Sequence, residues 1–217
     1  MSRVDFSLYL VTDRHQTGGR PLLPLLRDAL GAGLRAVQLR ERDLLTRPLL
    51  VLAEEVLRLT HEHKALLLIN DRVDVVLAVE ADGVHLRSDS LPVAVARRLL
   101  GPHRVIGVSA HSVDEVVRAE ADGADFAVLG PVYETRSKQV YGQPIGLRPI
   151  EEASRRCRLP VLAIGGITAA RSGEVRRAGA SGVAVISAIL SAADVPAATL
   201  QLLGTNARLG ERATQMP

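Results

Sequence analysis

Eight short aliphatic runs alternate with longer amphipathic segments along the chain, and this alternation restricts the fold more than any other feature. The runs lie at residues 8–11, 36–39, 65–69, 83–86, 105–109, 126–129, 161–164 and 183–186. Short runs rich in Leu, Val, Ile and Ala are typical of parallel strands that are buried on both faces. Their alternation with helices predicts a parallel sheet. Eight repeats favour a closed (β/α)8 TIM barrel over an open doubly wound sheet.

The segments between these runs carry the signals of helices. We expect helices at about 22–30, 48–61, 73–79, 92–100, 113–121, 147–157, 170–178 and 195–203, where apolar residues recur at helical spacing. Ser112, with Glu115 three residues later, has the pattern of a capping box. No linker divides the chain. Residues 1–217 are therefore predicted to form one barrel domain, with a loose C-terminal tail at 204–217.

Composition excludes several classes of function. Aromatic residues are 2% of the chain, too few for the stacking platforms that bind single-stranded nucleic acids. The net charge is +3, but the basic residues are scattered, which favours solvated helix faces over a nucleic-acid surface. The sequence has no signal-peptide pattern and no membrane-length apolar run. We therefore expect a soluble, cytoplasmic protein without nucleic-acid or membrane partners, in which Cys157 is an ordinary thiol.

Polar side chains gather where the predicted strands end. The groups that follow the strands are Thr12 and Asp13; Gln38, Arg40 and Arg42; Asn70 and Asp71; His85 and Ser88; Ser109 and His111; Thr135, Ser137 and Lys138; Gly165 and Gly166; and Ser187. In a (β/α)8 barrel the C-terminal ends of all strands lie at one mouth, where active sites form. The pattern therefore predicts a single active site at that mouth.

Two anion-binding regions are predicted within this mouth. Gly165 and Gly166, with Ile186 and Ser187, would let backbone N–H groups approach a phosphate; the alternative is that the glycines only form a tight turn. Thr135, Ser137 and Lys138 would bind a second anionic group from a loop long enough to close as a lid. The alternative there is a solvated polar loop.

Other residues at the strand ends suggest acid–base and metal chemistry. Arg40 and Arg42 would hold a carboxylate or phosphate, although pairing with Glu41 is an equal alternative. His111 is the best acid–base candidate, because imidazole both takes and gives a proton near neutral pH, whereas His85 is interpreted as packed inside the barrel. Asp71 is a candidate magnesium ligand, but one carboxylate alone holds this ion poorly.

Several ordered motifs carry a family resemblance. They are 8–13 (LYLVTD), 37–42 (VQLRER), 69–72 (INDR), 82–86 (DGVHL), 107–111 (GVSAH), 130–138 (GPVYETRSK), 163–167 (AIGGI) and 183–189 (VAVISAI). Together they resemble the thiamine phosphate synthase/TenI superfamily of (β/α)8 barrels, from Leu8 to about Leu190. The resemblance implies a site for a thiazole phosphate, and a homodimer or larger homo-oligomer.

The superfamily implies two activities. Synthases join hydroxymethylpyrimidine diphosphate to a thiazole phosphate with Mg²⁺ and release pyrophosphate. The TenI branch converts a carboxylated thiazole phosphate into its aromatic tautomer without a metal. The synthase pattern maps onto Gln38, Arg40, Asn70, Asp71, Ser109, Thr135, Ser137 and Lys138.

The chain departs from the synthase pattern at two places. Arg42 stands where synthases usually have Lys. Ser90 stands where the second metal-ligand Asp would fall, with Asp89 one residue away. These departures favour a TenI-like thiazole tautomerase with no cofactor, in which His111 moves the proton. The alternatives are a Mg²⁺-dependent synthase whose metal site uses Asp71 and Asp89, and a non-catalytic regulatory protein that binds a thiazole phosphate.

Overall fold

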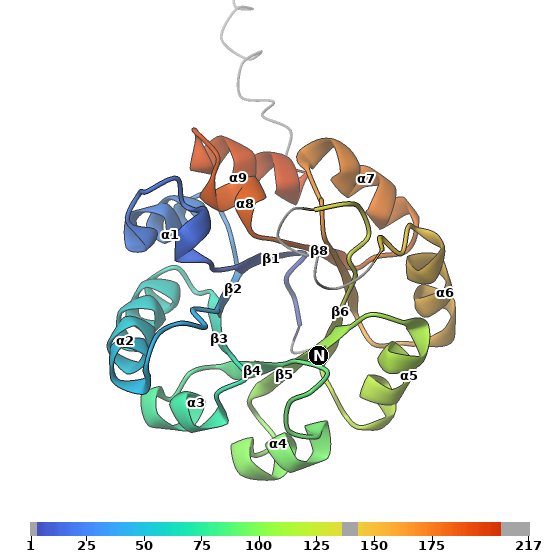
Figure 1. Ribbon diagram of the computed structural model, residues 1–217, viewed down its shortest axis with the longest axis horizontal. Helices are drawn as coiled ribbons and strands as arrows, with labels where there is room; N and C mark the ends of the chain where they lie inside the picture. Colours follow the sequence, from blue (N-terminus) through green and yellow to red (C-terminus); the bar gives the residue numbers. More distant parts are fainter. Residues whose placement is uncertain (1–3, 136–142, 205–217) are drawn as a thin grey trace, which may run out of the picture.

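The computed structural model describes residues 4–135 and 143–204, and in this part of the chain eight parallel strands close into a barrel (Figure 1). The strands are β1 (Leu8–Val11), β2 (Ala36–Leu39), β3 (Leu66–Asn70), β4 (Gly83–Leu86), β5 (Val105–Ala110), β6 (Phe126–Leu129), β7 (Val161–Ile164) and β8 (Gly182–Val185). Each pairs with the next in sequence, and β8 pairs with β1. The predicted (β/α)8 fold is confirmed.

Helices form a ring around this barrel (Figure 1). They are α1 (Leu22–Gly31), α2 (Thr46–Glu62), α3 (Val73–Val79), α4 (Val93–Leu100), α5 (Val113–Ala121), α6 (Arg148–Arg156), α7 (Ala169–Arg177), α8 (Ser187–Leu190) and α9 (Val195–Leu203), with a 3-10 turn, η1, at Arg14–Gln16. Ser112 caps α5 by accepting from the backbone N–H of Glu115, as predicted. The carboxylate of Glu115 departs from the predicted box, because it accepts from the N–H of His111 instead.

The one-turn helix α8 was not predicted from the sequence. It follows β8 directly, and its four residues continue the apolar run of the strand without a helical period. A single turn is too short for periodicity to show. Its first residue is Ser187, so the predicted phosphate loop is in fact the start of a helix.

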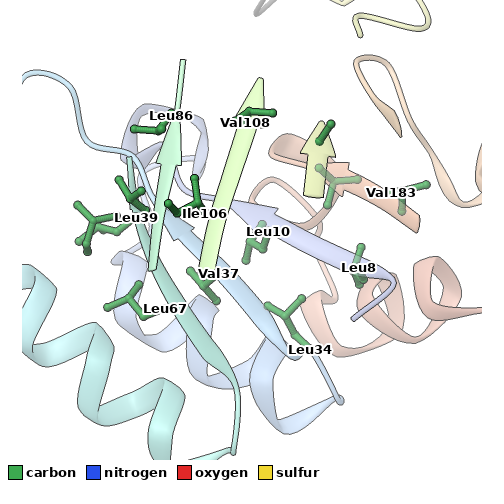
Figure 2. Close-up of a cluster of buried hydrophobic side chains, with 14 of the residues drawn as sticks. Leu8, Leu10, Leu34, Val37, Leu39, Leu67, Leu86, Ile106, Val108 and Val183 are labelled. Atoms are coloured by element: carbon green, nitrogen blue, oxygen red, sulfur yellow. The ribbon is translucent and has the colours of Figure 1, made fainter. Parts of the chain in front are cut away.

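The outward faces of the strands form the larger core. Along β1, Leu8 and Leu10 point outward to the helices, whereas Tyr9 and Val11 belong to a separate cluster inside the barrel. Figure 2 shows the outward set, with Leu10, Val37, Ile106 and their neighbours between strands and helices. Fully burying one such side chain contributes about 1.5–3 kcal/mol, so this layer supplies most of the apolar stabilisation of the fold.

The interior of the barrel is filled by aromatic rings beneath the mouth. Phe6, Tyr9 and Phe126 are buried there, and Phe126 meets Phe6 and Tyr9 edge-on, with ring centroids 5.3 and 5.4 Å apart. His85 joins the cluster, at 5.7 Å from Tyr9. A side chain at Gly107 would collide with this cluster, because a Cβ there would lie 2.3 Å from Phe126 and 2.8 Å from Nδ1 of His85. The scarce aromatic residues are thus concentrated under the candidate site.

Some sequence predictions concern residues that the structure does not describe. Ser137 and Lys138 of the predicted lid, and residues 205–217 of the predicted tail, lie outside the described residues. Within the described ranges, no helix is long and apolar enough to span a membrane.

Candidate active site

A cavity of about 450 Å³ opens at the C-terminal ends of the strands. Its lining includes seven of the predicted site residues: Gln38, Arg40, Arg42, Asn70, Ser109, His111 and Ile186. They come from β2, β3, β5 and the end of β8, so the barrel brings together residues that are far apart in sequence. The predicted convergence is therefore confirmed for these seven.

The loop that carries Arg40 and Arg42 is supported from below by Glu41. The Glu41 side chain is 1% exposed and accepts hydrogen bonds from the Thr12 hydroxyl (2.7 Å) and from the backbone N–H of Arg14 (3.2 Å). The Arg14 guanidinium also pairs with it at 3.3 Å, and the N–H of Arg40 donates to Thr12 Oγ1 at 2.9 Å. Glu41 thus ties the loops after β1 and β2 together, and its pairing is structural.

Three arginines line one side of the cavity. Arg40 and Arg42 follow β2, and Arg87 follows β4; we call this set the arginine arc. Arg87 binds the carboxylate of Asp89 through two hydrogen bonds, of 2.9 and 2.6 Å. The pKa of Asp89 lies below its ordinary value chiefly because of the hydrogen bonds from Arg87, and the positive charge of Arg42 adds to the effect. The arc is therefore an electropositive surface suited to an anion.

Asp71 lies beside this arc, in a side cavity of about 180 Å³ that shares Arg42, Asn70 and Arg87 with the main one. Its backbone is left-handed (φ 63°), a conformation that Asp tolerates better than most residues, and its N–H donates to the carbonyl of His85 at 2.9 Å. One carboxylate oxygen accepts the hydroxyl of Ser90, and the other lies 3.8 Å from Nε of Arg87. Ser90, rather than Asp89, is therefore the neighbour of Asp71.

The donor set at Asp71 is compatible with magnesium but sparse. Among the described residues, no three His, Cys, Asp or Glu side chains cluster as a metal site. Magnesium, however, usually takes one or two carboxylates from the protein and completes its shell with waters and substrate phosphates. The Asp71 carboxylate supplies one ligand of that kind, and the Ser90 hydroxyl is a second oxygen beside it.

The floor of the cavity is a row of hydrogen-bonded side chains. The Gln38 amide donates to the Tyr9 hydroxyl (3.2 Å), which lies 3.5 Å from Nδ1 of His85. Nε2 of His85 lies 3.0 Å from the Ser109 hydroxyl. Burial raises the pKa of Tyr9 well above its ordinary value, although the hydrogen bond from Gln38 opposes this, so the phenol stays protonated. His85 is packed inside the barrel, as expected, but it also lines the cavity.

His111 follows β5 directly and lines the cavity. Its Nδ1 lies 2.8 Å from the carbonyl oxygen of Gly130, at the end of β6. Because a carbonyl only accepts, Nδ1 carries a proton, and in the neutral form of the ring the lone pair would then lie on Nε2. This is the arrangement of a base that a carbonyl keeps in one orientation.

A second, smaller cavity of about 50 Å³ adjoins the main one, with which it shares Ile164 and Ile186. Thr135, Gly165, Gly166 and Ser187 line it, and we call these four residues the glycine cradle. The structure therefore brings together Gly165, Gly166, Ile186 and Ser187, the predicted phosphate site, and adds Thr135, which the sequence assigned to the second anion region.

The two glycines of the cradle are required by geometry. Both have positive φ, at 100° for Gly165 and 63° for Gly166. A Cβ on Gly165 would lie 2.6 Å from Pro131, and one on Gly166 would lie 2.7 Å from the carbonyl oxygen of Glu134. The two glycines form the tight turn that the sequence left as the alternative to a phosphate site. They also let the loop after β6 pack against the turn after β7.

Sequence reasoning missed Gln16 and Arg87, which line the main cavity. Asp13 was named only among the polar residues at strand ends, and Asp89 only as a possible second metal ligand, and both line the cavity as well. Strand register carries the missing signal. His85 pairs with Asn70, a proposed site residue on the neighbouring strand β3, which places the two at the same level of the barrel.

The fold and the mouth together define a class of protein: a (β/α)8 barrel with a cation-lined cavity and an adjoining glycine turn at the C-terminal ends of its strands. Residues 8–189 match the family described as "Thiamine monophosphate synthase". The chain belongs to this family, and it is an enzyme of thiamine biosynthesis.

Curated relatives cover nearly the whole chain. A putative thiamine-phosphate synthase of Geobacter sulfurreducens is 54% identical over 194 residues, which is 89% of this chain and 91% of the relative. Thiamine-phosphate synthases of Roseiflexus castenholzii and Moorella thermoacetica are 46% and 45% identical, over 90% and 91% of this chain and 86% and 94% of their own lengths.

Solved structures show the same similarity. A thiamine phosphate pyrophosphorylase from Pyrococcus furiosus superposes with a TM-score of 0.82 at 38% identity, over 90% of this chain and 93% of that one. A 3-hexulose-6-phosphate synthase, at 20% identity and a TM-score of 0.67 over 93% and 100% of the two chains, shares the fold alone.

Proposed function

We propose that this protein catalyses the magnesium-dependent coupling of hydroxymethylpyrimidine diphosphate with a thiazole phosphate, giving thiamine phosphate and pyrophosphate. This is the activity that the sequence left as an alternative, and the names of the relatives support it over tautomerisation. The observation that carries the proposal is that the arginine arc lines the main cavity, and that this cavity shares Ile164 and Ile186 with the cavity of the glycine cradle. Two anion sites suit two phosphorylated substrates that must meet.

The reaction breaks the C–O bond between the pyrimidine methylene and the diphosphate, and the electron pair leaves with pyrophosphate. The thiazole ring nitrogen then uses its lone pair to form the new C–N bond and becomes positively charged. In this proposal Arg40, Arg42 and Arg87 stabilise the charge that develops on the leaving pyrophosphate. The cradle holds the phosphate of the thiazole and so fixes the direction of attack.

Asp71 and Ser90 are the residues that would hold magnesium beside the arginine arc. When bound there, the ion would neutralise charge on the diphosphate and so improve the leaving group. Arg87 binds the carboxylate of Asp89, and its Nε lies 3.8 Å from the carboxylate of Asp71. Its guanidinium is therefore placed to add positive charge toward the diphosphate, at a site where the protein offers magnesium a single carboxylate, that of Asp71.

A pair of assays on the same purified protein tests the proposal. Thiamine phosphate formation is measured with both substrates, with and without Mg²⁺, and tautomerisation of carboxythiazole phosphate is measured in parallel. The proposal expects coupling that depends on Mg²⁺ and equimolar release of pyrophosphate. Tautomerisation with no coupling at any Mg²⁺ concentration would overturn it.

Tautomerisation remains a second candidate because of His111. The carbonyl of Gly130 orients the ring with a proton on Nδ1, and His111 lines the cavity. In that candidate His111 moves a proton between carbons of the thiazole, while Arg40 meets the substrate carboxylate. His111→Asn would then abolish tautomerisation and leave phosphate binding nearly intact. If the same variant keeps full coupling activity, His111 has no proton-transfer role in the synthase reaction.

A further inference from the structure

The floor of the cavity contains a polar chain that neither of the reactions above explains. Gln38, Tyr9, His85 and Ser109 lie on β2, β1, β4 and β5, and contact one another in that order at 3.2, 3.5 and 3.0 Å. Tyr9 is fully buried, and Gln38 and His85 are 3% and 2% exposed. Ser109 is half-buried and lines the cavity. This row of hydrogen-bonded side chains therefore runs from the interior of the barrel to the surface that faces a substrate.

The direction of hydrogen bonding along this chain follows from its first member. The Gln38 amide donates to the Tyr9 oxygen. The phenol then directs its own hydrogen to the next neighbour, Nδ1 of His85, which accepts. A neutral imidazole that accepts at Nδ1 carries its proton on Nε2. Nε2 consequently donates to Ser109, and the Ser109 hydrogen is left to point elsewhere.

We propose that Tyr9 and His85 are positioning residues, which fix the Ser109 hydroxyl as a hydrogen-bond donor toward the substrate ring. Ser109 has one hydrogen, and because its oxygen accepts from His85, that hydrogen is not used toward His85 and is available to donate into the cavity. The site would thereby select a ring that offers an acceptor, such as an unprotonated ring nitrogen, at that point. The identity of the ring rests on the proposed function, whereas the direction of the chain does not.

Packing alone does not account for these residues. The space around His85 is bounded by Tyr9 and Phe126, and Gly107 leaves room for the imidazole. An apolar side chain of similar size would fill the same space without the cost of burying polar atoms. Internal hydrogen bonds offset that cost but add little net stability. What the polar chain adds is a defined orientation at Ser109, the one member that is not almost fully buried.

The tautomer of His85 is the first test, and it requires no substrate. Long-range ¹H–¹⁵N spectra of the full-length protein with labelled histidine distinguish Nε2–H from Nδ1–H rings, and His85→Gln assigns the signal. We expect His85 to be neutral with the proton on Nε2, and Tyr9→Phe to shift the population toward the other tautomer. An Nδ1–H ring or an imidazolium in the wild type at neutral pH would overturn the proposal. So would a tautomer unchanged by Tyr9→Phe.

Variants at position 85 give the second test. A Gln side chain places an amide N–H near the position of Nε2, whereas Asn places one near Nδ1. We expect His85→Asn to raise the Kd for hydroxymethylpyrimidine diphosphate about tenfold, the change produced by loss of one hydrogen bond, and His85→Gln to recover much of that loss. Ser109→Ala should give a similar rise, with no further rise when combined with His85→Asn.

Two outcomes would contradict the positioning role. Equal losses in His85→Asn and His85→Gln would mean that only packing matters, and additive losses with Ser109→Ala would mean that His85 acts independently of Ser109. Phe126→Leu is the packing control, since it disturbs the same cluster without removing a hydrogen bond. Because Kd is measured without turnover, a protein that binds the diphosphate but does not couple would disprove the proposed function and leave this inference standing.

Discussion

The two anion-binding regions of the mouth are built in different ways. The arginine arc recognises charge through long side chains, whose own contacts, such as Arg87 with Asp89, must be exchanged for a ligand. The glycine cradle is defined by backbone turns that follow β7 and β8 and is held by close packing against the loop after β6. The arc is therefore open to substitution with graded effects, whereas the cradle tolerates almost no change. The predictions below test that difference.

Gly166→Ala should have the largest effect. A Cβ there would lie 2.7 Å from the Glu134 carbonyl oxygen and 2.8 Å from Cβ of Tyr133, in addition to the cost of φ 63°. We expect a loss of about 2–4 kcal/mol in unfolding free energy, measured by denaturant unfolding, and a large rise in KM for the thiazole phosphate. Gly18→Ala is the matched control, since Gly18 has φ 65° and nothing within 4 Å. Equal losses in the two variants would show that the cradle packing is not needed.

Glu41→Gln should come next, because it removes the charge that ties the loops after β1 and β2 together. Thr12 and Arg14 would keep weaker partners, so we expect a loss of about 1–3 kcal/mol in the free energy of unfolding. Glu62→Gln, on the exposed end of α2, should cost much less. A Glu41→Gln protein as stable as the wild type would mean that the arginine arc does not depend on this support.

Arg87→Gln should weaken diphosphate binding without unfolding the barrel. Loss of a charge-assisted contact predicts a rise of about tenfold or more in KM for hydroxymethylpyrimidine diphosphate, with KM for the thiazole phosphate nearly unchanged. Arg98→Gln removes the same charge from an exposed position on α4 and should change neither. A rise in both KM values would argue against separate anion sites.

Ser90→Asp should change the rate of coupling least among these variants, and it should change Mg²⁺ affinity most clearly. It places a second carboxylate next to Asp71, so like charges should lower stability without metal, and Mg²⁺ should restore it. We expect the variant to bind Mg²⁺ several-fold more tightly by calorimetry. Mg²⁺ binding that is unchanged by Ser90→Asp would place the ion elsewhere than beside Asp71.

The fold could be predicted almost completely, because each strand is a short aliphatic run and most helices have a clear apolar period. The helix that was not predicted, α8, is a single turn, and a single turn is too short to show a period. The cradle could also be predicted, since its turn depends on glycines that are visible in the sequence. Its close packing against Tyr133 and Glu134 could not, because it depends on tertiary contact.

The arginine arc was predicted only in part. Arg40 and Arg42 follow a strand at an obvious spacing, but Arg87 enters the site because β4 stands between β3 and β5 in the barrel. The partnership of Ser90 with Asp71 joins residues on successive loops and has no local signal. The same holds for Tyr9 and His85, which meet only because β1 and β4 face each other across the interior of the barrel.

The central claim is that the two anion sites serve a coupling of two substrates, and the most direct measurement of it follows both products in one reaction. The purified protein is incubated with hydroxymethylpyrimidine diphosphate, thiazole phosphate and Mg²⁺, and thiamine phosphate and pyrophosphate are quantified together. The account predicts that they appear in equal amounts, and that their formation depends on both substrates and on the metal. Pyrophosphate without thiamine phosphate, or neither product while carboxythiazole phosphate is aromatised, would contradict it.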